Sequence, residues 1–259
     1  MKIAVLTNSD SLYGRKILLA LQRARIPVTV IVVHQPVSYS ISLFFSVAKR
    51  VGLFDAIRQS IRRKIVNWTQ VRNFIRENPG VAPSFDALAV DAINVSSANS
   101  AQTVAALEQM GCDLLLLGQC GILKSEILHV PSKGVLNAHP GFLPAFRGLD
   151  SSKWAILENR WDQIGVTVHW VDEGVDTGSI IARRRHLLSG TVNSERLGEL
   201  LLEQCVNLLV EIVGEIIRNP KNVKTLTVRE EGVQYYKMHS SLIRLVDRIL
   251  AGRKFTDKR

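Results

Sequence analysis

The chain contains 259 residues, 46% of them hydrophobic, and carries a formal net charge of +10. A chain of this length and composition can bury a sizeable core, and nothing in the composition is typical of disorder. The apolar run after Met1 is too short for a signal peptide, and no window approaches the roughly 20 apolar residues that span a bilayer. We therefore expect a cytoplasmic protein without a membrane span.

The cysteines are few and irregularly spaced. There are three of them, an odd number, and no CxxC spacing occurs among them. We expect neither a disulfide framework nor a thiolate metal site, and we interpret all three as small buried apolar residues. They are Cys112, Cys120 and Cys205.

The first 34 residues have the pattern of a βαβ unit. Two β-branched runs, Ile3 to Thr7 and Val28 to His34, flank an amphipathic segment from Leu12 to about Arg25 that Pro27 closes. Such a unit builds a parallel sheet, so we predict a doubly wound, mostly parallel open sheet of the Rossmann-like kind. Ligands of such folds bind beyond the carboxyl ends of the strands.

A basic segment from about residue 40 to 78 follows as a helical insertion. Its apolar residues recur at three- and four-residue steps, which predicts two helices broken near Gly52. We interpret its charges as a solvated helix face, and a patch for nucleic acid or for a membrane is the less favoured alternative. The basic residues of the insertion are Lys49, Arg50, Arg58, Arg62, Arg63, Lys64, Arg72 and Arg76.

The most informative stretch runs from Gly134 to Ile181. Residues 135–139 read as a short buried strand, and its period of two places Asn137 and His139 on one face. Residues 165–171 read as the neighbouring strand, which delivers Asp176 in a turn beside that pair. A carboxamide, an imidazole and a carboxylate are the groups that acyl transfer to an amine requires.

The last part of the chain is predicted to be helical with a short appendage. A long amphipathic helix runs from about Ser194 to Arg218, where Asn219 and Pro220 stop it. We therefore divide the chain into a catalytic domain, residues 1–218, and an appendage, residues 219–259. For the appendage we predict a hairpin through 226–237 and a helix over 240–250, which cover the core or form a homodimer contact.

These motifs resemble the folate-dependent formyltransferase family, whose members act on methionyl-tRNA, glycinamide ribonucleotide and sugars. The resemblance covers about residues 1–217 and rests on an Asn-x-His-Pro strand end, a Leu-Pro then Arg-Gly loop, a His-x-Val strand and an Asp-x-Gly turn. Here they read Asn137-Ala138-His139-Pro140, Leu143-Pro144, Arg147-Gly148, Val166-Thr167-Val168-His169 and Asp176-Thr177-Gly178.

The resemblance implies a formyltransferase with 10-formyltetrahydrofolate as the formyl donor. Asn137 then donates to the developing oxyanion, His139 donates to that oxygen or to the departing folate nitrogen, and Asp176 orients His139 and accepts the proton of the amine. His169 stays open between a structural partner of the Asp176 loop and a group at the reaction centre. The expected folate contacts are Gly118, Gly121, Ile122, Leu123, Val171, Asp172, Glu173, Gly174 and Val175.

The acceptor is left open between several classes. A lone Gly14 makes a poor phosphate cradle, which disfavours glycinamide ribonucleotide. The short appendage disfavours methionyl-tRNA, and the positive charge favours an anionic substrate without choosing one. We expect a small-molecule amine, such as an amino sugar nucleotide or a biosynthetic intermediate, with nucleic acid as the less favoured partner.

Other reaction classes compete with amine formylation. A formyltetrahydrofolate hydrolase would use the same three residues with water in place of the amine, and the sequence does not separate it from a transferase. A metal hydrolase lacks regular ligand spacing, so we predict no metal, and a serine hydrolase lacks a G-x-S-x-G elbow.

Overall fold

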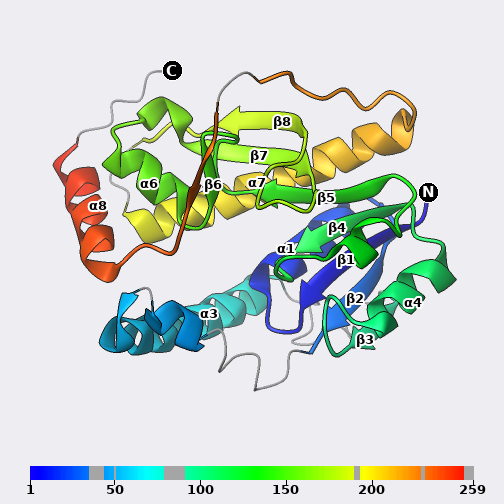
Figure 1. The fold of residues 1–259 in the computed structure, drawn as a ribbon, viewed down its shortest axis with the longest axis horizontal. Helices are drawn as coiled ribbons and strands as arrows, with labels where there is room; N and C mark the ends of the chain where they lie inside the picture. Colours follow the sequence, from blue (N-terminus) through cyan, green and yellow to red (C-terminus); the bar gives the residue numbers. More distant parts are fainter. Residues whose placement is uncertain (35–43, 50, 79–90, 190–192, 229–230, 254–259) are drawn as a thin grey trace. The chain divides into compact units, whose positions relative to one another are not determined.

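A computed structural model of the chain describes residues 1–34, 44–49, 51–78, 91–189, 193–228 and 231–253. These residues form two compact units, Met1–Leu136 and Asn137–Arg259 (Figure 1). The division falls inside strand β5 (Gly134–His139), so this strand contributes to both units. The boundary near residue 218 that the sequence predicts is a different division, between a catalytic domain and an appendage. It stays a prediction.

The first unit is built on parallel strands. Strand β1 pairs with β2 on one side and with β4 on the other, β3 extends the sheet beyond β2, and β4 pairs with the first half of β5. The two strands of each of these pairs run parallel. This confirms the doubly wound, mostly parallel fold expected from the βαβ pattern. The strands are β1 (Ile3–Asn8), β2 (Thr29–Val33), β3 (Ala92–Val95) and β4 (Leu114–Gly118).

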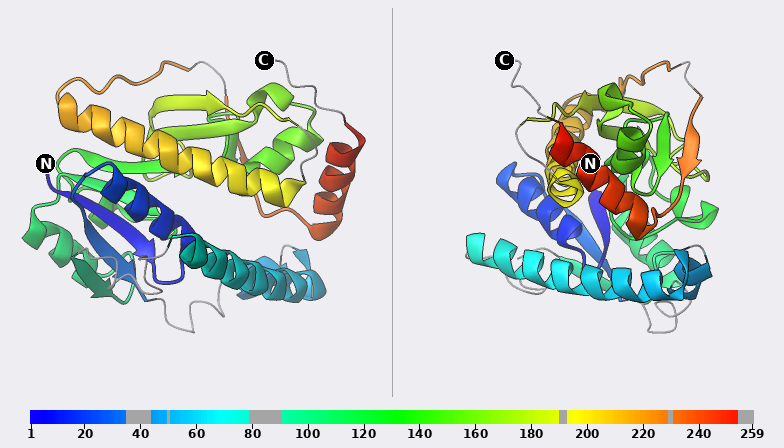
Figure 2. Two further views of the ribbon diagram at one scale, coloured as in Figure 1. Left: turned by 180° about the vertical axis from the view of Figure 1, so that it is seen from behind. Right: turned by 90° about the vertical axis from the view of Figure 1, so that its left-hand side faces the viewer.

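The helices of this unit cover a sheet that is apolar on both sides. All five residues of β4 are buried, as are Ile3 to Thr7 of β1. Helix α1 (Leu12–Arg23) begins at Ser11, whose hydroxyl accepts a hydrogen bond from Gly14 N–H, and it packs on β1 and β4. The reverse view in Figure 2 shows α1 in front of these strands. This unit also contains α4 (Ala101–Met110) and the short α5 (Ser125–Leu128).

The basic insertion forms helices on either side of Gly52, as predicted. Residues 44–49 are helical, and α3 (Leu53–Glu77) follows Gly52, whose φ of +85° breaks the helical path. The C-terminal end of α3 contacts α1. There Arg23 donates a hydrogen bond to the side chain of Asn78, and Phe74 is buried. Part of the insertion, residues 40–43 and 50, lies outside the described residues.

The second unit combines the end of β5 with an antiparallel pair, β7 (Gly165–Trp170) and β8 (Ile180–Arg185). Along the hydrogen-bonded sheet the strand order is β3-β2-β1-β4-β5-β7-β8, so the predicted strand over residues 165–171 is the neighbour of β5. Helix α7 (Ser194–Arg218) has the bounds that its apolar pattern predicts, and it packs on β7 and β8. None of the helices that the structure describes is long and apolar enough to cross a membrane.

The remaining elements of this unit connect the end of the chain to the loop after β5. Strand β6 (Phe146–Gly148) leads to α6 (Ser151–Leu157) and to a single helical turn at Trp161–Gln163. Helix α8 (Ser240–Gly252) packs on α6 and α7, which confirms the predicted last helix.

The predicted hairpin over residues 226–237 is wrong for the described residues, and residues 229 and 230 lie outside them. Strand β9 (Val233–Tyr235) pairs with β6, more than 80 residues earlier in the chain, and the pairing is parallel. The ring of Tyr235 stacks on that of Phe146, with centroids 5.1 Å apart. Because this pairing is long-range, no local turn signal announces it.

Candidate active site

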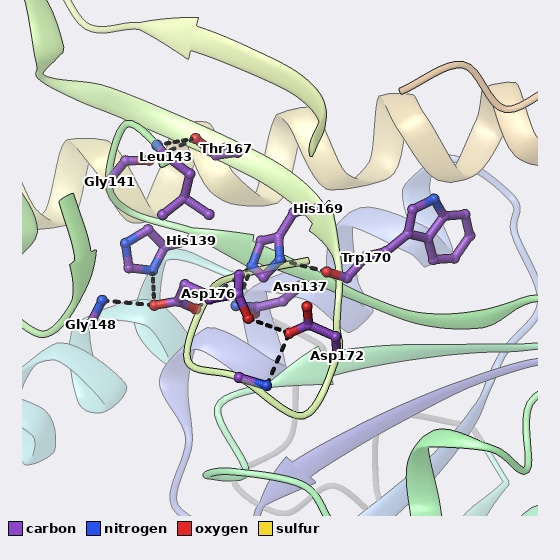
Figure 3. Close-up of polar contacts among 12 residues, drawn as sticks. Asn137, His139, Gly141, Leu143, Gly148, Thr167, His169, Trp170, Asp172 and Asp176 are labelled. Atoms are coloured by element: carbon purple, nitrogen blue, oxygen red, sulfur yellow. Dashed lines mark hydrogen bonds and ion pairs between the residues drawn. The ribbon is translucent and has the colours of Figure 1, made fainter. Parts of the chain in front are cut away.

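The end of β5 presents Asn137 and His139 on the same face, as their spacing predicts (Figure 3). The His139 ring is almost wholly buried, while Asn137 is partly exposed. After His139 the chain turns through a loop that the hydroxyl of Thr167 on β7 fixes from both sides. This hydroxyl donates to the Gly141 carbonyl at 2.8 Å and accepts from the Leu143 N–H at 3.1 Å.

Asp176 lies beside this pair, as the sequence predicts. Its Oδ2 is 3.4 Å from His139 Nδ1, and its Oδ1 is 3.7 Å from His169 Nε2. Its side chain is 15% exposed, so water or a ligand can reach the carboxylate. Asp176 itself adopts a left-handed backbone with φ of +52°, a conformation that an Asp tolerates better than most residues and that costs about 1 kcal/mol.

Two glycines make the turn around Asp176 possible by their lack of a side chain. A Cβ on Gly178 would lie 1.8 Å from the Trp170 carbonyl oxygen, and one on Gly174 would lie 2.0 Å from the Thr177 hydroxyl. The glycines therefore permit the close approach of two loop segments, while the unusual dihedral angle falls on Asp176.

His169 lies between Asn137 and Asp176. Its Nδ1 lies 2.7 Å from the Trp170 carbonyl, which can only accept, so this nitrogen carries the hydrogen. Its Nε2 then accepts from the amide of Asn137 at 3.3 Å. Burial lowers the pKa of His169 and outweighs the opposing attraction of Asp176, so the ring is neutral near pH 7.

The protonation of His139 follows from its neighbours in the same way. Burial lowers its pKa, although Asp176 opposes the shift, so this ring is also neutral. Its Nε2 lies 3.1 Å from the Ser151 hydroxyl and 3.3 Å from the Phe146 carbonyl. Both ring nitrogens of His139 face an acceptor, since Nδ1 faces the Asp176 carboxylate and Nε2 faces the Phe146 carbonyl and the Ser151 hydroxyl. The neutral ring carries one hydrogen and can donate it toward only one of these sides.

Two groups at this site are absent from the sequence-based prediction. The hydroxyl of Ser151 contacts His139, and the backbone N–H of Gly148 donates to Asp176 Oδ2 at 2.9 Å. Arg147, of the Arg-Gly motif, donates to the Gly232 carbonyl of the appendage at 3.1 Å. The sequence could have drawn attention to Ser151, because this residue closely follows the Arg-Gly motif and begins the next helix.

The predicted folate contacts lie in two loops. In the first unit, the Gly118 carbonyl accepts from the hydroxyls of Thr7 and Ser11, Gly121 has a φ of +91°, Ile122 is exposed and Leu123 is buried. The Gly118 carbonyl is thus occupied within its own unit, while Gly121 and Ile122 face outwards. None of these four contacts is tested, and each stays a prediction.

The other predicted contacts follow β7 in the second unit. Asp172 accepts from the Gly174 N–H and from the Thr177 hydroxyl, so its carboxylate shapes the turn. Glu173 and Gly174 are exposed, and Val171 and Val175 are partly exposed. These residues also stay predicted contacts.

The chain is a doubly wound α/β protein, and its site presents an amide, two neutral imidazoles and a carboxylate near the end of β5. These groups are suited to proton transfer during acyl chemistry. The formyl transferase family model matches residues 1–213, and the chain belongs to this family.

Known proteins similar to the chain point the same way. A methionyl-tRNA formyltransferase from Methylacidiphilum infernorum is 37% identical over 135 residues, which cover 50% of this chain and 41% of that protein. A sugar N-formyltransferase from a Shewanella species has a similar fold, with a TM-score of 0.57, 14% identity and coverage of 96% of this chain and 86% of the other.

A phosphoribosylglycinamide formyltransferase from Streptococcus pneumoniae gives a TM-score of 0.52 at 22% identity, covering 83% of this chain and 98% of the other. Likenesses at this level of identity concern the fold. The chain spans less than half the length of the curated relative described above.

Proposed function

We propose that the chain is an N-formyltransferase that moves the formyl group of 10-formyltetrahydrofolate to the amine of a small molecule. Membership of the formyl transferase family supports the reaction class. The observation that carries the proposal is the contact of Asp176 with both histidines, together with the Asn137 amide held by His169. These groups match what attack of an amine on a formyl carbon demands.

Asn137 supplies the donor for the developing oxyanion. One hydrogen of its amide is directed to His169 Nε2, which fixes the plane of the carboxamide and leaves the second hydrogen for an incoming oxygen. A preorganised donor of this kind is worth on the order of 10²- to 10³-fold in rate. His169 is therefore a positioning residue in this scheme.

Asp176 removes the proton that the amine loses when its nitrogen bonds to the formyl carbon. The C–N bond to the folate nitrogen then breaks, and that nitrogen must gain a proton. His139 Nδ1 faces Asp176, so the proton that Asp176 has taken from the amine can pass through this pair to the folate nitrogen. The net change is one N–C bond formed, one N–C bond broken and one proton moved.

The same cluster could be used with other acceptors. Methionyl-tRNA is a second candidate because curated relatives of the chain are methionyl-tRNA formyltransferases. Hydrolysis of the donor by water is a third possibility. We favour a small amine because the appendage is occupied within its own unit, where β9 pairs with β6 and α8 packs on α6.

Release of tetrahydrofolate from the 10-formyl donor tests the proposal. We expect slow release from the donor alone, a sharp rise with the correct amine, and no rise with methionine-charged tRNA. Rapid release without an amine would assign the chain to the hydrolases, and stimulation by charged tRNA would replace the small amine as acceptor. Binding of 5-formyltetrahydrofolate, measured by titration calorimetry, tests the predicted folate contacts independently of turnover.

Single substitutions identify the residues that act. We expect Asn137→Ala, His139→Ala and Asp176→Ala each to lose most turnover while remaining folded, with double variants little worse than the worst single one, because residues that act as a unit are not additive. Glu215→Ala, at an exposed position of α7 outside the proposed site, provides the control. Wild-type turnover by His139→Ala would refute its assignment.

A further inference from the structure

Among the described side chains of α3, one set of apolar residues is buried and a second set is exposed. Ala56 and Phe74 are buried. A second row, at four-residue steps, is exposed, and Phe54 beside it is 90% exposed. The members of this outward face are Leu53, Phe54, Ile57, Ile61 and Ile65, each at least 41% exposed.

The exposed arginines agree with the expected solvated helix face, but the exposed apolar row was not expected. An amphipathic surface helix turns its large apolar residues to the core and its charges to water. Five large apolar side chains exposed on 13 consecutive residues, Leu53 to Ile65, form an apolar patch of the kind that marks an interaction site. In Figure 1 the first half of α3 extends away from α1 and from the strands of its own unit.

The charges of α3 show what kind of partner this face fits. The helix contains six basic residues and two acidic ones, a net charge of +4. Arg58, next to Ile57, is exposed, and Arg72 lies two turns after Ile65 on the same side of the helix and is exposed as well. Apolar side chains bordered by arginines are typical of helices that lie in the headgroup region of anionic bilayers.

We propose that the outward face of α3 binds the surface of an anionic phospholipid membrane, with the helix lying in the plane of the interface. A polyanion such as RNA would engage the arginines but give no partner to Leu53, Phe54 and Ile57. A second copy of the same face would bring together two helices of net charge +4, which repel each other. A membrane surface satisfies the apolar residues and the charges together.

Vesicle binding tests this proposal directly. The full chain is mixed with vesicles of phosphatidylcholine alone or of phosphatidylcholine with phosphatidylglycerol, and the bound fraction is measured by sedimentation. We expect strong binding only with the anionic lipid, weaker as salt rises because surface charges are screened. Equal binding to both vesicle types, or to neither, overturns the proposal.

Two sets of variants separate the contributions. Removing Arg58, Arg72 and Arg76 by substitution with Gln should weaken anionic binding on the order of 100-fold, because each surface cation contributes about fivefold. Replacing Ile57 and Ile61 by Ser should weaken it by roughly tenfold or more for each side chain. The charge-matched control, with Gln at three exposed cations outside α3, should bind as the wild type does. Its positions are Lys224, Arg244 and Arg248.

A fluorescent label reports where the helix lies. The three native cysteines are buried, so a polarity-sensitive dye reacts selectively at Phe54→Cys, with Lys224→Cys as the control position. We expect a blue shift with anionic vesicles at position 54 and none at 224. If instead the wild type bound tRNA but no vesicles, or formed a dimer that Ile57→Ser abolished, the face would belong to that partner and the membrane proposal would be wrong.

Discussion

Gly148 connects the appendage to the Asp176 carboxylate, which we propose to be catalytic, and Gly148→Ala tests this connection. The residue has a φ of +90°, and its N–H donates to Asp176 Oδ2 at 2.9 Å. A Cβ at this position would lie 2.2 Å from the carbonyl oxygen of Tyr235 on β9. Because this neighbour is backbone, the clash can be relieved only by moving the loop or the strand.

The magnitude follows from the contacts that are lost. A left-handed backbone costs a residue with a side chain about 1–2 kcal/mol, so we expect the free energy of unfolding to fall by about that amount. A hydrogen bond to a charged group contributes about 1.5–3 kcal/mol, and its loss from a group that acts in the transition state corresponds to roughly 10- to 100-fold in turnover.

Turnover and thermal unfolding of the same preparation provide the assay. Gly198→Ala in α7 is the control, because a Cβ there meets nothing within 4 Å and helix propensity favours Ala by about 1 kcal/mol. Gly232→Ala provides the second arm, since its Cβ would lie 2.0 Å from the Pro144 carbonyl and would displace the appendage from the loop. Wild-type turnover in both Gly148→Ala and Gly232→Ala would refute the connection.

Three further predictions concern ionisable groups. Burial opposes ionisation of Asp150, but two lysines and hydrogen bonds outweigh it and lower its pKa to about 2. Its contribution of roughly 2 kcal/mol is therefore present above pH 4 and lost as the pH falls toward 2, and Asp150→Asn should remove this part of the pH dependence of unfolding. Burial also lowers the pKa of His139, so stability should decrease as the pH falls below about 6.5, and His139→Gln should reduce that decrease. Burial raises the pKa of all three cysteines, to about 11 for Cys112 and about 12 for Cys120, so a thiol reagent should modify the native protein far more slowly than the unfolded one.

Local patterns predicted the elements that carry the catalytic residues. The period of two in β5 places Asn137 and His139 on one face, and the bounds of α7 follow from its apolar repeat and from the stop at Asn219. These features depend on neighbours in sequence, so they can be read without tertiary contacts.

Features that depend on distant segments escaped the prediction. The pairing of β9 with β6 and the donation by Gly148 N–H to Asp176 join residues far apart in the chain, and nothing local encodes either. In α3 the periodicity correctly predicts a helix, but it cannot tell which of two apolar faces is buried. The left-handed backbone of the turn falls on Asp176 and not on one of its glycines, which the local sequence does not indicate.

The pairing of β9 with β6 also bears on how the protein is made. Arg147 and its partner Gly232 are 85 residues apart, so several seconds separate their synthesis at the usual ~5–20 residues per second. A nascent chain can complete β5 and β7 during this interval, but the loop that holds the Gly148 N–H against Asp176 has no partner strand yet. This loop thus gains its neighbouring strand late in translation, and a chain released before residue 233 would contain Asn137, His139 and Asp176 without β9.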